Sequence, residues 1–302
     1  MDHKDLSQQI LKFKKEKDAI LLVHNYQLND IQLMADYLGD SLGLSRIAAQ
    51  AEESMIVFCG VMFMAETAKI LSPEKTVLLP RLDAGCPMAE MANVEGLLNL
   101  KQAHPDAMVI SYVNSTAEVK AVTDVCCTSA NAVQVVQNVK ADKIIFAPDR
   151  NLASWVQRFT DKKIIPWDGY CYVHDQYAVK EVEVARELHP DGVIVVHPEC
   201  PKEVADLADE VFSTSGMVTF ASKSSAKKII IGTEGGMLDR LKRENPDKTF
   251  LALGSVKMCR GMKVTRLEDL HRALEKNQHP IKLDETIMNR ARSALERMLD
   301  YV

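Results

Sequence analysis

The sequence predicts an α/β protein built from three repeated α/β/α units, whose small parallel sheets surround a pseudo-threefold axis and a central active site. Three apolar, β-branched runs at residues 19–23, 107–111 and 193–196 read as buried strands, and each ends in a polar triplet. The triplets begin at His24, Tyr112 and His197, which are 88 and 85 residues apart. A period of that size indicates a repeated supersecondary unit.

The other predicted elements recur in the same phase. A second apolar run covers 55–59, 143–146 and 228–231, a helical pattern starts near 65, 152 and 237, and a third strand-like run covers 76–79, 163–165 and 249–253. Alternating strands and helices predict parallel sheets with right-handed crossovers. Two further positions hold the same kind of residue in every unit, a hydroxyl and then a cysteine: Ser41, Ser129 and Thr214, and Cys86, Cys171 and Cys259.

The repeat divides the chain into segments with a fourth, unrepeated piece at the end. We expect a first repeat at 1–85, a second at 86–171 and a third at 172–262. Residues 263–302 are expected to form C-terminal helices that pack back on the first repeat, at 265–275 and 284–299. Asp284 is a suitable N-cap for the second of these helices.

Composition narrows the class of protein. The 302 residues include 47% hydrophobic side chains, and the net charge of −5 comes without the basic stripe that would follow a nucleic-acid backbone. Neither a signal peptide nor 18 uninterrupted apolar residues are found, so we expect a cytoplasmic protein with no membrane partner.

The seven cysteines are interpreted as reduced thiols, because their number is odd and no export signal precedes them. No CxxC pair occurs, so a metal site would have to be assembled from distant segments. We assign Cys59, Cys126 and Cys127 to packing. Cys200 directly follows Glu199 but has no equivalents in the other repeats, so we expect a buried packing role for it as well.

Polar residues that follow parallel strands gather at one edge of the sheet, where ligands bind. Three cysteines converging there suit either a metal with a fourth, non-cysteine ligand or a four-iron cluster with one open iron, which acts as a Lewis acid. Proton donors and acceptors for dehydration and condensation are His24, Tyr26, Tyr112, His197 and Glu199. Asn114 would orient a carboxylate or carbonyl group, and the three hydroxyls would bind carboxylate or phosphate.

Long motifs in this chain resemble the quinolinate synthase family from residue 19 to residue 262. They include His24-Asn25-Tyr26-Gln27, Gly39-Asp40-Ser41-Leu42, and the segments 63–71, 112–118, 128–132, 197–200 and 213–217. The resemblance implies condensation of iminoaspartate (iminosuccinate) with dihydroxyacetone phosphate to quinolinate, phosphate and water in NAD biosynthesis.

The family also implies roles for individual residues. A [4Fe-4S] cluster would be held by Cys86, Cys171 and Cys259, with its open iron taking a substrate ligand. Acid and base groups would be Tyr26, Tyr112, His197 and Glu199. The substrate-binding set would be His24, Ser41, Tyr112, Val113, Asn114, Ser129, His197, Pro198, Glu199 and Thr214.

Two departures from the family pattern concern the cysteines. Many relatives have Gly-His-Cys at the second ligand, where this chain has Gly169-Tyr170-Cys171. Others carry CxxCxxC near the third ligand, where this chain has Cys259 alone, which excludes a regulatory disulfide there.

Two alternative functions remain open from the residues themselves. One is an iron–sulfur hydro-lyase acting on another dicarboxylate. The other is a non-catalytic, zinc-stabilised binding protein in which His197 or His24 completes a three-thiolate site. The family further suggests a homodimer and a functional link to an aspartate oxidase or dehydrogenase that supplies iminoaspartate. We also expect the first unit to close over the cluster and exclude water.

Overall fold

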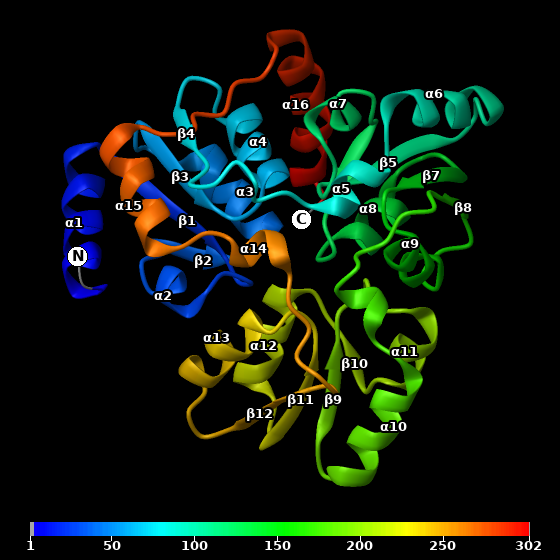
Figure 1. Cartoon of the computed structure of the whole chain (residues 1–302). Coiled ribbons are helices and arrows are strands. Elements are labelled where there is room, and N and C mark those ends of the chain that lie inside the picture. The colour runs from blue at the N-terminus through cyan, green and yellow to red at the C-terminus, as the bar shows by residue number, and fades with distance from the viewer. Residues whose placement is uncertain (1–2, 302) are drawn as a thin grey trace.

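Three four-stranded parallel sheets form the framework of the computed structural model, which describes residues 3–301 (Figure 1). Residues 1, 2 and 302, at the ends of the predicted first and last segments, lie outside the described residues. Every sheet has the same order, in which the second strand of the unit flanks the first and the third and fourth follow on the other side. The predicted class, three repeated α/β units with small parallel sheets, is confirmed.

The strands of the three sheets correspond one to one. The first sheet contains β1 (Ala19–His24), β2 (Tyr37–Gly39), β3 (Met55–Cys59) and β4 (Thr76–Leu78). The second contains β5 (Met108–Tyr112), β6 (Val125–Cys127), β7 (Lys143–Ala147) and β8 (Lys163–Pro166). The third contains β9 (Val193–Val196), β10 (Glu210–Val211), β11 (Lys228–Gly232) and β12 (Thr249–Ala252).

Three of these strands differ from the predicted pattern of three strands per unit. The edge strands β2, β6 and β10 contain two or three residues each, which is too short for alternation or an apolar run to signal a strand. Of the three, only the stretch around Cys126 and Cys127 looks strand-like in the sequence. Parallel pairing with the central strands β1, β5 and β9 defines these edge strands instead.

Helices cover the sheets and lead back from one strand to the next. The first unit contains α1 (His3–Glu16), α2 (Asn29–Gln32), α3 (Ser41–Gln50) and α4 (Met62–Leu71). The second contains α5 (Pro87–Met91), α6 (Val94–Ala103), α7 (Ala117–Lys120), α8 (Ala132–Asn138) and α9 (Arg150–Gln157). The third contains the short 3-10 turn His174–Gln176, α10 (Val179–Leu188), α11 (Lys202–Leu207), α12 (Thr214–Lys223), α13 (Gly236–Glu244) and α14 (Arg260–Lys263).

The C-terminal helices α15 (Leu267–Lys276) and α16 (Glu285–Leu299) pack in different places. Figure 1 shows α15 beside α1, on the first unit. By contrast, α16 packs against β6 and α7 of the second unit as well as α4 of the first. The buried face of α16 joins the apolar cluster shared by both units and consists of Ala291, Ala294, Leu295 and Met298. The helix therefore packs on the second unit as well as on the first.

Three cysteines that have no equivalents in the other units are core residues. Cys59, Cys126 and Cys127 are fully buried in strands and belong to the apolar clusters of the first and second units. Their assignment to packing is therefore confirmed.

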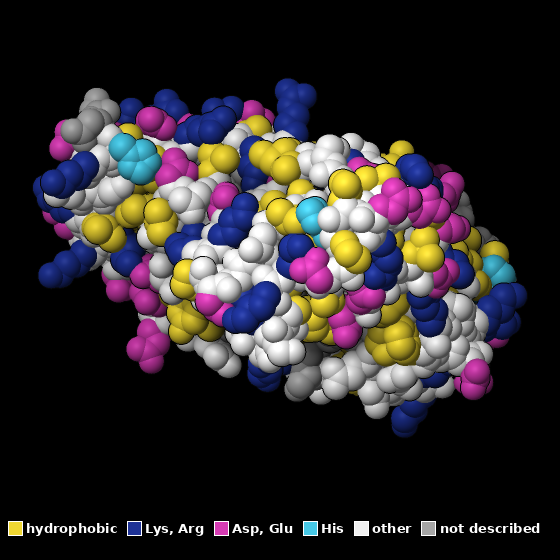
Figure 2. Space-filling model, turned by 90° about the horizontal axis from the view of Figure 1, so that it is seen from below, with side chains coloured by type: hydrophobic (Ala, Val, Ile, Leu, Met, Phe, Trp, Pro, Cys, Tyr) yellow, Lys and Arg dark blue, Asp and Glu magenta, His cyan; other side chains and the backbone are white. Residues whose placement is uncertain are grey.

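On the face shown in Figure 2, acidic and basic side chains are interspersed, and no extended basic stripe is visible there. No helix within residues 3–301 is both long enough and apolar enough to cross a lipid bilayer.

Polar contacts tie the first unit to the third. Asn25 Nδ2 donates to Thr214 Oγ1 at 2.8 Å, and Gln32 Nε2 donates to the carbonyl oxygen of Gly236 at 3.0 Å. Arg240 Nη1 donates to the carbonyl oxygen of Leu38 at 2.9 Å. These contacts surround the loop after β1 and hold its polar residues next to the third unit.

Candidate active site

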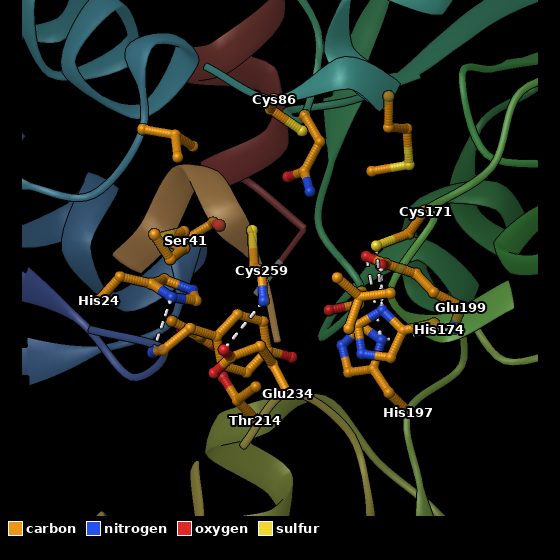
Figure 3. A pocket seen from close by; sticks show the side chains of 18 of the residues that line it. His24, Ser41, Cys86, Cys171, His174, His197, Glu199, Thr214, Glu234 and Cys259 are labelled. Atoms are coloured by element: carbon orange, nitrogen blue, oxygen red, sulfur yellow. Dashed lines mark hydrogen bonds and ion pairs between the residues drawn. The ribbon is translucent and has the colours of Figure 1, made fainter. Parts of the chain in front are cut away.

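The ends of the three sheets meet around one cavity (Figure 3). His24 and Tyr112 are the last residues of β1 and β5, and His197 directly follows β9, so the strands themselves deliver these side chains. The cavity is lined by most of the residues predicted from the sequence: His24, Tyr26, Ser41, Cys86, Tyr112, Asn114, Ser129, Cys171, His197, Glu199, Thr214 and Cys259.

Two of the predicted site residues, Val113 and Pro198, lie outside this lining, and so does Cys200. Val113 is buried and lines a small neighbouring pocket instead. Pro198 is buried within the loop after β9, and its side chain does not line the cavity. Cys200 is also buried, and its thiol donates to the carbonyl oxygen of Gly232. The thiol of Cys200 is therefore directed into the third unit's core.

The cavity gathers three thiols from three equivalent loops. Cys86 precedes α5, Cys171 follows β8, and Cys259 precedes α14. All three are partly exposed, whereas the other four cysteines are buried. Figure 3 shows the labelled thiols around one space, each on a ribbon from a different part of the chain.

The thiols of the three loops also interact electrostatically. Burial raises the pKa of Cys86 to about 12, and Cys259 contributes in the same direction. Burial, then the charge of Glu199, raises the pKa of Cys171 well above its usual range. Thiols in this state are protonated at neutral pH and must each release a proton to become metal ligands.

The chemistry of these donors fits a metal group held by cysteine. Convergent cysteines without a fourth cysteine nearby are suited to a centre with an open coordination position. The ligand atoms of Cys171, His174 and Glu199 lie within 4.8 Å of one another, which places acid–base groups beside this thiol.

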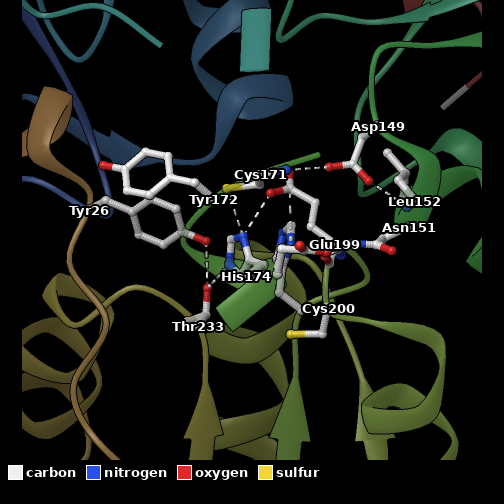
Figure 4. A network of polar contacts seen from close by, with 12 residues as sticks. Tyr26, Asp149, Asn151, Leu152, Cys171, Tyr172, His174, Glu199, Cys200 and Thr233 are labelled. Atoms are coloured by element: carbon white, nitrogen blue, oxygen red, sulfur yellow. Dashed lines mark hydrogen bonds and ion pairs between the residues drawn. The ribbon is translucent and has the colours of Figure 1, made fainter. Parts of the chain in front are cut away.

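A continuous chain of hydrogen bonds crosses the cavity wall, and Figure 4 shows its part from Glu199 through His174 and Thr233 to Tyr26. Tyr112 donates through its hydroxyl to Glu199 Oε1 at 2.6 Å, and His174 Nδ1 lies 2.7 Å from Glu199 Oε2. On the other side of its ring, His174 Nε2 lies 2.8 Å from Thr233 Oγ1, which is 2.6 Å from the hydroxyl of Tyr26. The relay of these five residues thus connects two tyrosines through one carboxylate.

The directions of these hydrogen bonds depend on the tautomer of His174. If His174 donates from Nδ1 to Glu199, its Nε2 accepts from Thr233, and Thr233 accepts from Tyr26. The Tyr177 hydroxyl donates to the Thr233 carbonyl oxygen at 2.7 Å and fixes that residue. His174 also stacks on His197, with the two ring centroids 4.5 Å apart.

Burial sets the protonation states of the aromatic groups. It raises the pKa of both Tyr26 and Tyr112 well above the usual value, and the charge of Glu199 adds to the effect. Burial lowers the pKa of His24 to about 3, with Lys263 contributing, and also lowers the pKa of His197 to about 3. At neutral pH both tyrosines are therefore proton donors, and both histidines are neutral.

Glu199 is the carboxylate at the centre of the relay. Burial on its own would raise its pKa, but His197 and His174, with hydrogen bonds from His174 and Tyr112, lower the pKa below its usual range. Only 3% of the residue's surface is exposed. A buried carboxylate with two donors facing it is ionised and accepts hydrogen bonds from both of them.

The predicted hydroxyls lie at helix starts or in a turn. Ser41 and Thr214 are the first residues of α3 and α12, whose N-caps are Asp40 and Ser213, so neither predicted hydroxyl is the helix cap. Ser129 lies in the turn before α8. At the starts of α3 and α12, free amides and a hydroxyl favour an anion.

Asn114 presents an unused acceptor to the cavity. Among the described residues, its Oδ1 is one of the few buried side-chain oxygens without a hydrogen-bond partner. A buried amide oxygen without a partner is costly, and a ligand with a donor group would satisfy it.

The sequence analysis missed three residues of the site: His174, Thr233 and Glu234. His174 had one available signal, its position three residues after Cys171. Thr233 and Glu234 lie in the glycine-containing segment 232–236. Glu234 is fully buried and lines the cavity, and its carboxylate accepts from the amide of Cys259 at 3.0 Å.

Comparisons with known proteins find similarity to one family along almost the whole chain. The family model described as quinolinate synthetase A protein matches residues 8–300. A protein named quinolinate synthase from Geobacter sp. (strain M21) is 52% identical over 299 residues, covering 99% of this chain and 98% of that protein. Proteins of the same name from Thermodesulfovibrio yellowstonii and Methanoregula boonei are 52% and 51% identical, with 98% and 97% of both chains covered.

Proposed function

Because the chain belongs to the quinolinate synthetase A family and is a quinolinate synthase, we propose that it joins iminoaspartate to dihydroxyacetone phosphate in the central cavity. The observation that carries this proposal is the meeting of three equivalent cysteines with a buried acid–base relay. A binding protein that uses metal only for stability has no need of such a relay. The products would be quinolinate, phosphate and water.

Cys86, Cys171 and Cys259 would hold a [4Fe-4S] cluster. When bound, the cluster would supply an iron with an open position, a Lewis acid that polarises a substrate hydroxyl or carboxylate. The partial exposure of these three thiols to the cavity supports their role, since the four buried cysteines have no comparable access.

Substrate anions would be bound without basic side chains. No Lys or Arg is among the described residues that line the cavity, although both substrates are negatively charged. Ser41, Ser129 and Thr214 would supply hydroxyl donors, and α3 and α12 would direct free amides toward the carboxylates and the phosphate. Asn114 would accept from an imine or hydroxyl N–H or O–H group through its free Oδ1.

Glu199 would act as the general base. Forming the ring requires protons to leave carbon and nitrogen, while the departing hydroxyl groups must gain protons. Tyr112, which donates to Glu199 at 2.6 Å, would serve as an acid on one side of the cavity. On the other side, Tyr26 would act as a second acid, and hydrogen bonds through Thr233 and His174 connect its hydroxyl to Glu199.

His24 and His197 would act as neutral partners. With their pKa values lowered by burial, neither carries a charge that would compete with the substrate for Glu199. The amide of Tyr26 donates to His24 Nδ1 at 3.2 Å, so the other ring nitrogen is left to donate into the cavity. His197 would likewise orient a substrate oxygen.

We further propose a cytoplasmic enzyme, a homodimer in solution, and a supply of iminoaspartate from an aspartate oxidase or dehydrogenase. The instability of an imine in water gives a physical reason for a nearby source. The division into repeats at 1–85, 86–171 and 172–262 is the organisation on which the convergence of the cysteines rests.

The test is quinolinate formation under anaerobic conditions. Protein loaded with iron and sulfide would be mixed with freshly generated iminoaspartate and dihydroxyacetone phosphate, and quinolinate and phosphate would be measured together. Equal amounts of both products from the loaded protein, and none from the apoprotein, are expected. Phosphate release without quinolinate, or no turnover by fully loaded protein, would contradict the proposal.

A further inference from the structure

All three units share one backbone contact next to the cysteine. Directly after the third strand of each sheet, an amide donates to the carbonyl oxygen two residues before the cysteine, at 2.8, 2.8 and 2.9 Å. The donor and acceptor pairs are Met62 and Ala84, Arg150 and Gly169, and Gly235 and Lys257. This contact fixes the equivalent positions in the three units.

The residue just before each of these donors is equivalent in the repeat but differs in kind. It lies six residues after the start of β3, β7 or β11, and it is Val61, Asp149 or Glu234. Both carboxylates are completely buried. A buried carboxylate is costly unless it is well bonded, so its presence at two equivalent positions requires a reason.

Each carboxylate holds the amide of its own unit's cysteine. Asp149 Oδ2 accepts from the amide of Cys171 at 3.1 Å, as Figure 4 shows. Glu234 Oε1 accepts from the amide of Cys259 at 3.0 Å. Val61 has no acceptor in its side chain, so the first unit lacks this contact to Cys86.

Ordinary helix capping does not account for both contacts. Asp149 caps α9 with its other oxygen, which accepts from Leu152 N at 2.8 Å. Glu234 Oε2 accepts from Gly236 N at 2.7 Å, although the N-cap of α13 is Gly235. In both residues the second oxygen is therefore directed to the cysteine loop, not to the helix.

Glu234 also links the third unit to the first. Lys263 Nζ lies 3.0 Å from the Glu234 carboxylate and also donates to the carbonyl oxygen of Tyr26. The ion pair is shielded from water, because Glu234 is buried and the Lys263 side chain is 12% exposed. One buried pair thus connects the Cys259 loop to the loop of Tyr26.

We propose that Asp149 and Glu234 are positioning residues for the metal centre, which hold the backbones of Cys171 and Cys259 so that both thiols face the cavity. The inference rests on the proposed cluster. Cys86 is then the least restrained ligand, because its unit has valine at the equivalent position. Groups that orient metal ligands commonly change metal affinity by about 10- to 100-fold when they are replaced.

The variants Asp149→Asn and Glu234→Gln test this role with little change in shape. An amide has one acceptor oxygen, so its NH₂ group must face one of the two backbone amides that the carboxylate now satisfies. Asp269→Asn is the matched control, because Asp269 is a buried carboxylate of α15 that accepts from Arg266 N and Arg272 but does not line the cavity. Glu234→Asp is a second variant, which keeps the charge but withdraws the carboxylate by one methylene group.

The measurement is the rate at which anaerobically loaded protein loses iron to a ferrous chelator, followed by the visible absorbance of the cluster. The electron paramagnetic resonance signal of the reduced protein gives a second readout. We expect iron loss to be about 10- to 100-fold faster in Asp149→Asn and Glu234→Gln, smaller but measurable acceleration in Glu234→Asp, and no change in Asp269→Asn. Circular dichroism of each apoprotein controls for folding.

The outcomes separate this inference from the proposed function. If the unmodified protein loads no cluster, both are overturned. If it loads a cluster and the folded variants lose iron at its rate with unchanged spectra, the positioning role alone is overturned. Equal acceleration in Asp269→Asn would also contradict it, because any buried carboxylate would then produce the effect.

Discussion

Replacing Thr233 with valine removes the central hydroxyl of the relay but keeps the shape of the side chain. Thr233 Oγ1 lies 2.6 Å from the hydroxyl of Tyr26 and 2.8 Å from His174 Nε2. The residue is buried, and it does not line the cavity. A change in rate would therefore arise from the relay and not from lost contact with substrate.

The expected loss follows from the value of a positioned proton-transfer group. General acid–base catalysis contributes about 10²- to 10⁴-fold, so we expect kcat to fall by at least about 100-fold in Thr233→Val. That factor corresponds to about 2.7 kcal/mol in the activation free energy. Two lost neutral hydrogen bonds would reduce the stability of folding by about 1–3 kcal/mol, which a protein of this size tolerates.

Steady-state quinolinate formation by loaded protein is the assay, with Thr233→Ser and Tyr26→Phe as companions. Serine keeps the hydroxyl, so its activity should stay within a fewfold of the unmodified enzyme. Cluster content must be equal in all samples. If Thr233→Val retains nearly full kcat while Tyr26→Phe loses it, Tyr26 acts without the relay, and the proposed role of the relay is wrong.

Three further predictions concern binding, pH and motion. Asn114→Ala should raise the KM of one substrate about tenfold with little change in Tm, because a free acceptor and not a structural bond is lost; an unchanged KM for both substrates would contradict this. Burial lowers the pKa of His24 and His197 to about 3, so below pH 6.5 the unfolded chain binds more protons than the folded chain. The free energy of unfolding should therefore keep its full value above pH 6.5 and decrease as the pH falls toward 3. The free energy of unfolding should fall by at most about 1.4 kcal/mol per pH unit for each histidine, which urea titrations between pH 7.5 and 5 measure. The variant His24→Asn should show a weaker dependence of this free energy on pH. Substrates should slow hydrogen exchange in the segment around Tyr26 if the first unit closes over the cavity, and equal exchange with and without them would argue against closure.

The buried parts of the fold were the easiest to predict. Central strands of parallel sheets are covered on both faces, so they appear in the sequence as continuous apolar runs, as in β3 and β11. The edge strands carry no comparable signal. The position of α16 was also not predictable. The composition of its apolar face suits the groove between two units as well as the surface of one unit, and only the assembled fold decides between them.

Repetition explains which site residues were predicted. The three cysteines and three hydroxyls recur at 88 and 85 residues, so they stand out without any structure. His174 and Thr233 have no equivalents of their kind in the other units. Asp149 and Glu234 recur in only two units, and their role depends on amides of cysteine loops that come close only in the folded chain.

The most direct test of the account compares single cysteine variants of the loaded enzyme. Alanine at Cys86, Cys171 or Cys259 should each abolish quinolinate formation and reduce the iron content, while alanine at the buried Cys200 should retain a full cluster and most of the activity. Full activity after loss of any one of the three cavity thiols, or loss of the cluster in Cys200→Ala alone, would contradict the assignment of the metal centre and with it the proposed site of quinolinate synthesis.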